Sequence, residues 1–195
     1  MTHKRLFNQE NEYYDSSDLR KGIFASVGDN VRIARNCTIV GEENISIGDN
    51  VRIDGYCTII ATGNVRLGSY IHIGSYCHLS GGDGFMMEDF SGLSQGVYIY
   101  TRSDDYSGAY MTNPTLPSLY TSALKGEVVL KRHVIIGAKS TIMPGVTIGE
   151  GSAVGAKSLV KNSLDGWGIY AGNPVRRIRE RLPHLLELEK QFKSQ

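Results

Sequence analysis

Large aliphatic residues recur at every sixth position along most of the chain. The pattern starts at Val27, Ile33 and Ile39, repeats 20 and 40 residues later, and resumes after an interruption at Leu130, Ile136, Ile142, Ile148, Val154 and Val160. A six-residue unit cannot bury its aliphatic side chain alone, whereas three units form one triangular coil whose inward side chains stack on those of the next coil. The pattern therefore predicts an all-β fold, a parallel β-helix of hexapeptide repeats. The period alone does not decide its handedness.

The three cysteines mark the same repeat, because Cys37, Cys57 and Cys77 are spaced by 20 residues. Stacked coils would place their Cα atoms roughly 4.8 Å apart, which a disulfide can span. We favour reduced thiols that fill space in a corner column, since the number is odd. A metal site is not indicated, because the sequence has no CxxC or His/Cys ligand spacing.

The breaks in the repeat divide the chain. Residues 1–24 form an expected N-terminal extension with a short helix capped by Ser16 or Ser17, and residues 25–172 form the β-helix. An external loop at 100–128, rich in Asp, Ser, Tyr, Thr and Pro, interrupts the coils, and a loop of this length is usually functional. For residues 173–195 we expect a helical tail, with Asn173 as the cap and Pro174 at the first helical position.

Composition narrows the class of function. The formal net charge is +1, without the clustered basic excess of a nucleic-acid-binding protein. No apolar run reaches the length of a membrane span, and the first 20 residues lack the apolar segment of a secretory signal. We therefore expect a cytoplasmic protein that binds a small molecule.

Several motifs resemble those of the hexapeptide acyltransferases, closest to the galactoside, maltose and xenobiotic acetyltransferases, which include enzymes that modify sugars for surface polysaccharides. These motifs are the repeat itself, Ile136-Gly137-Ala138, Met143-Pro144-Gly145-Val146-Thr147-Ile148-Gly149 and Ala171-Gly172-Asn173-Pro174-Val175-Arg176. The resemblance covers roughly residues 27–179. It implies a left-handed β-helix and a homotrimer with active sites in clefts between neighbouring prisms. It also implies acetyl-CoA as cosubstrate and no metal.

The resemblance also assigns roles on the donor side. Ala138 and Ala156 correspond to the pantetheine contacts, where small side chains let the backbone approach the ligand, and Lys161 to an adjoining contact. Arg176 and Arg179 correspond to basic residues that suit the phosphates of CoA, because guanidinium groups form charge-assisted hydrogen bonds with phosphate oxygens.

The acceptor side departs from the family. The family's Ile-Tyr-Thr-x-x-His stretch, whose histidine acts as general base on a hydroxyl, ends here in Asp104, and a family asparagine falls on Tyr76. A hydroxyl needs a base with a pKa near neutrality, whereas a neutral amine needs only one proton removed after attack. The sequence therefore favours an amine as acceptor, with Tyr76 and Tyr106 as candidate contacts to it.

Either Asp104 or Asp105 could orient the amine and accept its proton. Two adjacent acids raise one another's pKa if both are buried. The alternative is that the pair only initiates a turn with Ser103 and Gly108.

Our hypothesis is an acetyl-CoA-dependent acetyltransferase that acts on a sugar, favouring a nucleotide-linked amino sugar. Three alternatives remain open. One is a sugar O-acetyltransferase with His78 as its base, and another is a non-catalytic trimeric scaffold. The third is a carbonic-anhydrase-like protein, for which His72 and His78 would supply zinc ligands between subunits.

Overall fold

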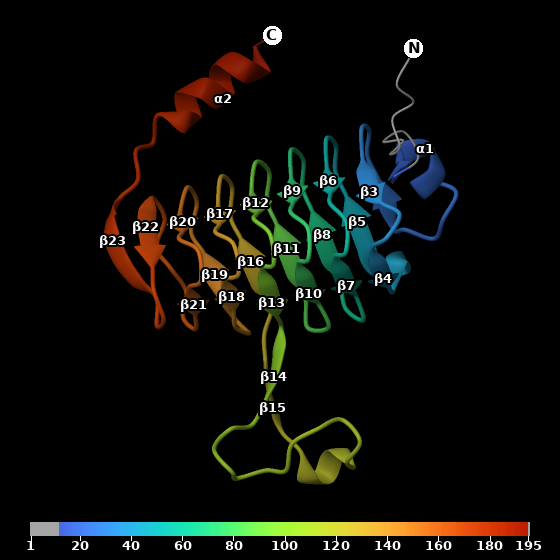
Figure 1. Ribbon diagram of the computed structural model, residues 1–195, viewed down its shortest axis with the longest axis vertical. Coiled ribbons are helices and arrows are strands. Elements are labelled where there is room, and N and C mark those ends of the chain that lie inside the picture. The colour runs from blue at the N-terminus through green and yellow to red at the C-terminus, as the bar shows by residue number, and fades with distance from the viewer. Residues whose placement is uncertain (1–11, 195) are drawn as a thin grey trace, which may run out of the picture.

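Three sheets form the sides of a prism in the computed structural model, which describes residues 12–194 (Figure 1). The first sheet has nine strands, β1 (Tyr13–Asp15), β3 (Arg32–Ala34), β6 (Arg52–Ile53), β9 (His72–Ile73), β12 (Gly92–Leu93), β17 (Ile135–Ile136), β20 (Ala153–Val154), β22 (Gly168–Ala171) and β23 (Arg176–Glu180). The second has six, β4 (Thr38–Val40), β7 (Thr58–Ile60), β10 (His78–Ser80), β13 (Tyr98–Tyr100), β18 (Thr141–Ile142) and β21 (Leu159–Val160). The third also has six, β2 (Ser26–Val27), β5 (Ile45–Ile47), β8 (Val65–Leu67), β11 (Phe85–Met87), β16 (Val128–Leu130) and β19 (Thr147–Ile148). The predicted β-helix of stacked coils is confirmed.

The six-residue period builds the core as expected. Ile33 lies opposite Ile53, and Ile53 opposite Ile73, in neighbouring parallel strands. The inward residues of these coils are almost fully buried, and the largest of them is Phe85. Each coil thus covers the apolar face of the next, which is how short units that could not fold alone reach a stable core.

The cysteines stack as predicted, and all three are free. Each thiol donates a hydrogen bond of 3.2 Å to a carbonyl of the following coil, on Asp54, Gly74 and Ser94 in turn. Their role is to fill and bond one corner of the prism.

Two corners carry side chains on backbone in the left-handed region, which non-glycine residues adopt uncommonly. We call one the tyrosine–lysine corner; its residues have φ between 57° and 66° and are Tyr56, Tyr76, Gly96, Lys139 and Lys157. We call the other the helix-covered corner, formed by Tyr70, Phe90 and His133. The third, where the external loop leaves the prism, is the arm corner.

The external loop is a two-stranded arm that stands away from the prism (Figure 1). Its strands β14 (Arg102–Asp104) and β15 (Ala123–Lys125) pair in antiparallel fashion, and a short 3₁₀ helix at Ser118–Tyr120 follows the outer loop. At its root the Arg102 guanidinium donates to both carboxylate oxygens of Asp83, at 2.8 and 3.0 Å. This bidentate pair fixes the direction in which the arm leaves the prism.

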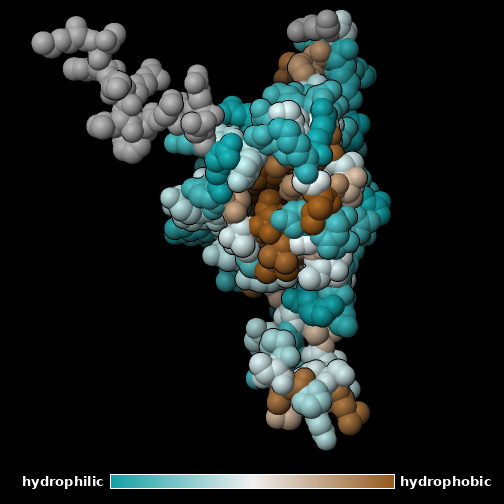
Figure 2. Space-filling model, turned by 90° about the vertical axis from the view of Figure 1, so that its right-hand side faces the viewer, coloured by the Kyte–Doolittle hydropathy of each residue, from teal (hydrophilic) through white to brown (hydrophobic). Residues whose placement is uncertain are grey.

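Near the N-terminal end, the helix α1 (Ser16–Leu19) is capped by Asp15 rather than by Ser16 or Ser17. The Asp15 carboxylate accepts from the amides of Ser17 and Asp18, at 2.8 and 3.0 Å. The Ser16 hydroxyl instead accepts from the Val31 amide, which ties α1 to the first coil. The first 11 residues of the expected extension lie outside the described residues. Figure 2 looks onto this end, where hydrophobic side chains gather in the middle of the surface.

The tail differs from the helix expected from Asn173 onward. The chain turns back after Gly172, whose φ is +107°, and β23 then pairs antiparallel with β22. An open sheet edge leaves backbone donors and acceptors unpaired, and this hairpin covers the last parallel strand. The helical part of the tail starts only after Pro183, in α2 (Leu185–Lys193). It lies across the helix-covered corner, where the ring of Phe192 packs edge-on against Tyr70 at 5.1 Å.

Candidate active site

The tyrosine–lysine corner brings the two predicted pantetheine contacts together. Ala138 and Ala156 directly precede the corner lysines in successive coils, and the Lys157 amide donates to the Ala138 carbonyl at 2.8 Å. Neither alanine is buried, so the backbone beside these small side chains is open to a ligand. Lys161, exposed, lies two residues after Leu159 of the last coil.

Arg176 and Arg179 lie on β23 and not on a helix. Arg176 is opposite Ala171 and Arg179 is opposite Ile169, so both extend the C-terminal end of the same sheet. Both are exposed, and within residues 12–194 neither forms a salt bridge, whereas Arg177 between them pairs with Glu180 at 2.8 Å. Among the three arginines of β23, the two predicted phosphate contacts are therefore those without an acidic partner in the described part of the chain.

Asp104 is the last residue of β14, on the arm. It is exposed, and its carboxylate accepts one long hydrogen bond, 3.3 Å, from the amide of Asn113. A cavity of about 470 Å³ beside it is lined by Arg102, Asn113, Ser122 and Lys125, among others. Its carboxylate thus retains accepting capacity.

Asp105 builds the turn that follows. Its carboxylate accepts from the Ser107 hydroxyl at 2.8 Å and from the amides of Gly108 and Tyr110 at 3.1 and 3.2 Å. The hydrogen bond from Ser107 holds the pKa of Asp105 below its usual range. The condition under which the two acids would raise one another's pKa, burial of both, is not met, because neither side chain is buried.

The remaining acceptor candidates are spread over the molecule. His78 lies on β10 with its ring 6.0 Å from that of Tyr98, and partial burial lowers its pKa, which favours the neutral imidazole. Tyr76 stacks on Tyr56 at the tyrosine–lysine corner. Tyr106 is 92% exposed on the arm. A single chain does not gather these residues around one point.

The two histidines of the carbonic-anhydrase-like alternative are separated within one chain. His72 is on β9 in the first sheet and His78 on β10 in the second, so six residues place them on different sides of the prism. The Nε2 atom of His72 is 2.7 Å from a carboxylate oxygen of Asp54. Between residues 12 and 194 no group of three or more His, Cys, Asp or Glu side chains is placed to hold a metal ion.

None of the helices in residues 12–194 has the length and apolar character that crossing a membrane requires.

Comparison with known proteins agrees with this architecture. The family model described as bacterial transferase hexapeptide (six repeats) matches residues 127–162. The dTDP-4-amino-4,6-dideoxy-D-glucose acyltransferase of Escherichia coli is 42% identical over 182 residues, which cover 93% of this chain and 95% of that protein.

Solved structures of other proteins are also similar to this chain. AntD, an N-acyltransferase from Bacillus cereus, is 48% identical, with a TM-score of 0.91 over 95% of this chain and 99% of that one, in a complex with dTDP-4-amino-4,6-dideoxyglucose and coenzyme A. It has also been solved with dTDP and 3-hydroxybutyryl-CoA. Its crystallised variants change a serine or an aspartate that lies ten residues further along that chain. A maltose O-acetyltransferase from Clostridium difficile, 24% identical with a TM-score of 0.56, shares the fold.

These matches cover nearly the whole of both chains, so the similarity is not confined to the repeats. This chain therefore belongs to the hexapeptide-repeat acyltransferases, enzymes with an acyl-CoA cosubstrate, as its sequence predicted.

Proposed function

We propose that the chain transfers an acyl group from CoA to the amino group of a nucleotide-linked amino sugar. The observation that carries the proposal is the presence of Asp104 where the resemblance expects a hydroxyl-activating histidine, in a chain that matches amino-sugar acyltransferases over nearly its whole length. A carboxylate suits an amine, since it can hold the ammonium form in place and then take the proton that nitrogen loses.

The reaction assigns a task to each part of the site. The amine nitrogen attacks the thioester carbonyl, a C–N bond forms and the C–S bond breaks. The proton released from nitrogen passes by way of Asp104 and ends on the sulfur of CoA. Backbone N–H groups near Ala138 stabilise the oxyanion, because fixed dipoles in a partly dry site need no reorganisation.

We also assign Ser94 to the acceptor site, a residue that the sequence analysis did not single out. Ser94 and Asp104 are the only serine and aspartate in this chain with the order and ten-residue separation of the pair substituted in AntD. Ser94 is half-buried at the tyrosine–lysine corner, two residues before Gly96. Other coils carry Asp54 or Gly74 at this position, so the repeat pattern gives no signal for it.

We further propose that each site is shared between subunits of a trimer. In one chain Ser94 and Asp104 lie at different corners, because β13 runs along the side of the prism between them; at ~3.3 Å per residue that side is on the order of 15 Å long. The arm carries exposed apolar side chains, seen as brown atoms at its outer end (Figure 2). One of them is Leu119, which is 81% exposed. An arm that crosses to a neighbouring prism would bury them and bring Asp104 to that subunit's Ser94.

The setting follows from the substrates. We place the enzyme in the cytoplasm, where thiols such as its free cysteines stay reduced. We assign its product to the assembly of surface polysaccharides, which use nucleotide-linked sugars.

The test measures thiol release from acetyl-CoA and 3-hydroxybutyryl-CoA with a panel of dTDP-linked amino sugars and of sugars that carry only hydroxyl groups. We expect turnover with a 4-amino sugar nucleotide and little with its 4-hydroxy counterpart. Preference for the hydroxyl sugars, lost in His78→Ala, would replace this proposal by O-acylation. That alternative is favoured by the lowered pKa of His78, which keeps a neutral base available.

A further inference from the structure

The tyrosine–lysine corner continues past the reacting groups toward the N-terminal end of the prism. Its lysines lie beside the predicted CoA contacts, Gly96 lies beside Ser94, and Tyr76 and Tyr56 follow in the next two coils. One coil further, the equivalent position is Asn36. With coils ~4.8 Å apart, Ser94 and Asn36 are separated by roughly 14 Å along the corner, a span on the scale of a hexose joined to a diphosphate.

Tyr56 and Tyr76 form a parallel stack with an open end. Their ring centroids are 5.1 Å apart and the ring planes differ by 5°. Both rings remain largely exposed, at 60% and 61%. The face of Tyr56 that does not meet Tyr76 points toward the coil of Asn36, and within residues 12–194 no ring occupies the third place of the stack.

The helix-covered corner provides an internal comparison. Tyr70 and Phe90 occupy the equivalent left-handed positions there and stack in the same way, with centroids 4.8 Å apart. Phe192 of α2 packs edge-on against both rings. One aromatic stack is thus covered by the chain itself, whereas no residue between 12 and 194 contributes a further ring to the other.

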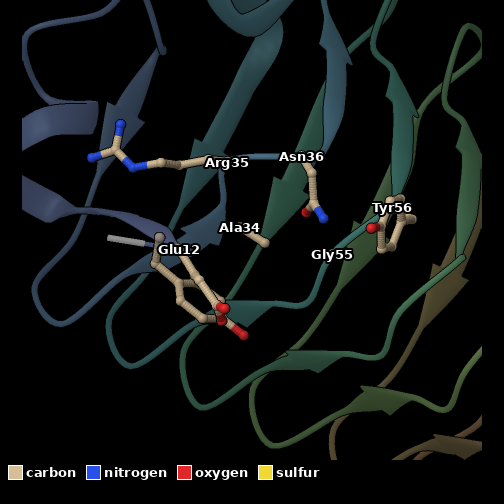
Figure 3. Close-up of a pocket in the computed structure, with 7 residues that line it drawn as sticks. Glu12, Ala34, Arg35, Asn36, Gly55 and Tyr56 are labelled. Atoms are coloured by element: carbon tan, nitrogen blue, oxygen red, sulfur yellow. The ribbon is translucent and has the colours of Figure 1, made fainter. Parts of the chain in front are cut away.

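A cavity of about 410 Å³ adjoins the open face of Tyr56 (Figure 3). Glu12 and Tyr13, adjacent in the chain, line it as one wall. Arg35 also lines it, and its guanidinium points away from Asn36 and Tyr56. The Asn36 amide lies between that wall and the Tyr56 ring. Gly55 leaves room for it, since a Cβ there would come within 2.6 Å of the Asn36 side-chain oxygen.

The Tyr13 wall is held in place from both sides. Its hydroxyl donates to Asp54 at 3.2 Å, and the Arg32 guanidinium lies 4.5 Å from the ring centroid. Asp54 is in turn held by Arg52 at 3.0 Å. The cavity is therefore preorganised, which lowers the entropy cost of filling it.

We propose that this cavity holds the base of the nucleotide on the acceptor, stacked as the third ring on Tyr56. The proposal rests on the proposed function, and it names the part of the site that recognises the nucleotide. A pyrimidine offers a flat ring to Tyr56 and an edge with both a donor and an acceptor, which one amide such as Asn36 can pair with. The sugar then extends along the corner toward Ser94.

The experiment measures the dissociation constant of dTDP by calorimetry for the whole protein and for Tyr56→Leu. Base stacking on an aromatic side chain contributes ~1–3 kcal/mol, so we expect dTDP to bind roughly 5- to 150-fold more weakly. Tyr56→Phe keeps the stack and should bind nearly as well as the original. The matched control is Tyr70→Leu, which removes the same residue from the same backbone position at the covered corner and should leave dTDP affinity unchanged.

Two further measurements guard against a variant that merely unfolds. CoA affinity should be the same in every variant, and Asn36→Ala, a change at an exposed side chain, should also weaken dTDP binding. In the original protein the thymine methyl and H6 resonances of bound dTDP should shift upfield from the ring current of Tyr56, and the shift should vanish in Tyr56→Leu.

Equal dTDP affinity of Tyr56→Leu and the original protein would overturn this subsite and leave the proposed function intact. A changed sedimentation coefficient for Tyr56→Leu with unchanged dTDP affinity would also overturn it, because the stack would then contact another copy of the chain. An original protein that does not bind dTDP, yet acylates an amino sugar without a nucleotide, would overturn both proposals.

Discussion

The Nε2–H group of His133 donates a hydrogen bond of 2.7 Å to the Glu189 carboxylate, across 56 residues of sequence. His133 opens the coil after the arm, and Glu189 lies on α2. The same carboxylate binds Arg132 and, at 2.6 Å, Lys193. The His133 ring also stacks on Phe90 at 5.2 Å, so one buried acid joins the C-terminal helix to a corner of the prism. His133 is only 9% exposed, because the helix covers it.

This contact predicts a loss of stability in acid. Burial raises the pKa of Glu189, but hydrogen bonds from Lys193 and His133 outweigh it and lower the pKa to about 2. A carboxyl whose pKa is lower in the folded than in the unfolded protein stabilises the fold above its unfolded pKa, near 4.3, and loses that contribution as the pH falls toward 2. The melting temperature, measured between pH 6 and pH 2, should therefore fall as the pH decreases through this range.

Glu189→Gln should remove most of this pH dependence and lower the melting temperature at pH 7 by several degrees, since a buried group loses charged partners. Glu187→Gln is the matched control on the same helix, because Glu187 is exposed. Identical acid profiles for Glu189→Gln and the original protein would contradict the role given to this carboxylate.

Asp104→Asn should lower kcat on the order of 10²–10⁴-fold, the usual contribution of a positioned acid or base, with acyl-CoA affinity nearly unchanged. Asp105→Asn serves as control, since its carboxylate is already engaged by the turn, and should retain most of the activity. Steady-state thiol release with the amino sugar nucleotide measures both. If His78→Ala shows the large loss and Asp104→Asn does not, the base is a histidine.

Changing Arg176 and Arg179 together to Ala should weaken CoA binding more than binding of dephospho-CoA if they contact the 3′-phosphate. The control is Arg177→Ala, because Arg177 is paired with Glu180. Calorimetry with both ligands decides the matter. Equal losses for the two ligands would move the arginines to another part of the cofactor.

The protein should sediment at about three times the 21.4 kDa of one chain. Replacing the exposed apolar residue Leu119 of the arm by Ser should shift the equilibrium toward smaller species and reduce turnover in proportion, since Asp104 would leave its site. A fully active monomer at micromolar concentration would refute the shared site.

Much of this architecture follows from local pattern. The six-residue period is a property of each coil, so it predicted the stacked sheets, the buried column and the point where the arm interrupts the repeat. Sequence also placed Ala138 and Ala156 in successive coils, because the register of a β-helix repeats with its period.

The tertiary structure decided what depends on residues far apart in the chain. Arg176 lies on a strand because the last parallel strand needed a partner for its backbone groups, a demand that no local propensity encodes. The two corners carry similar aromatic pairs, Tyr56 with Tyr76 and Tyr70 with Phe90. Only the second pair is covered, because α2 folds back onto the helix-covered corner. Repetition thus determined the prism, whereas the non-repeating segments that pack on it determined which of its equivalent positions remain open for a ligand.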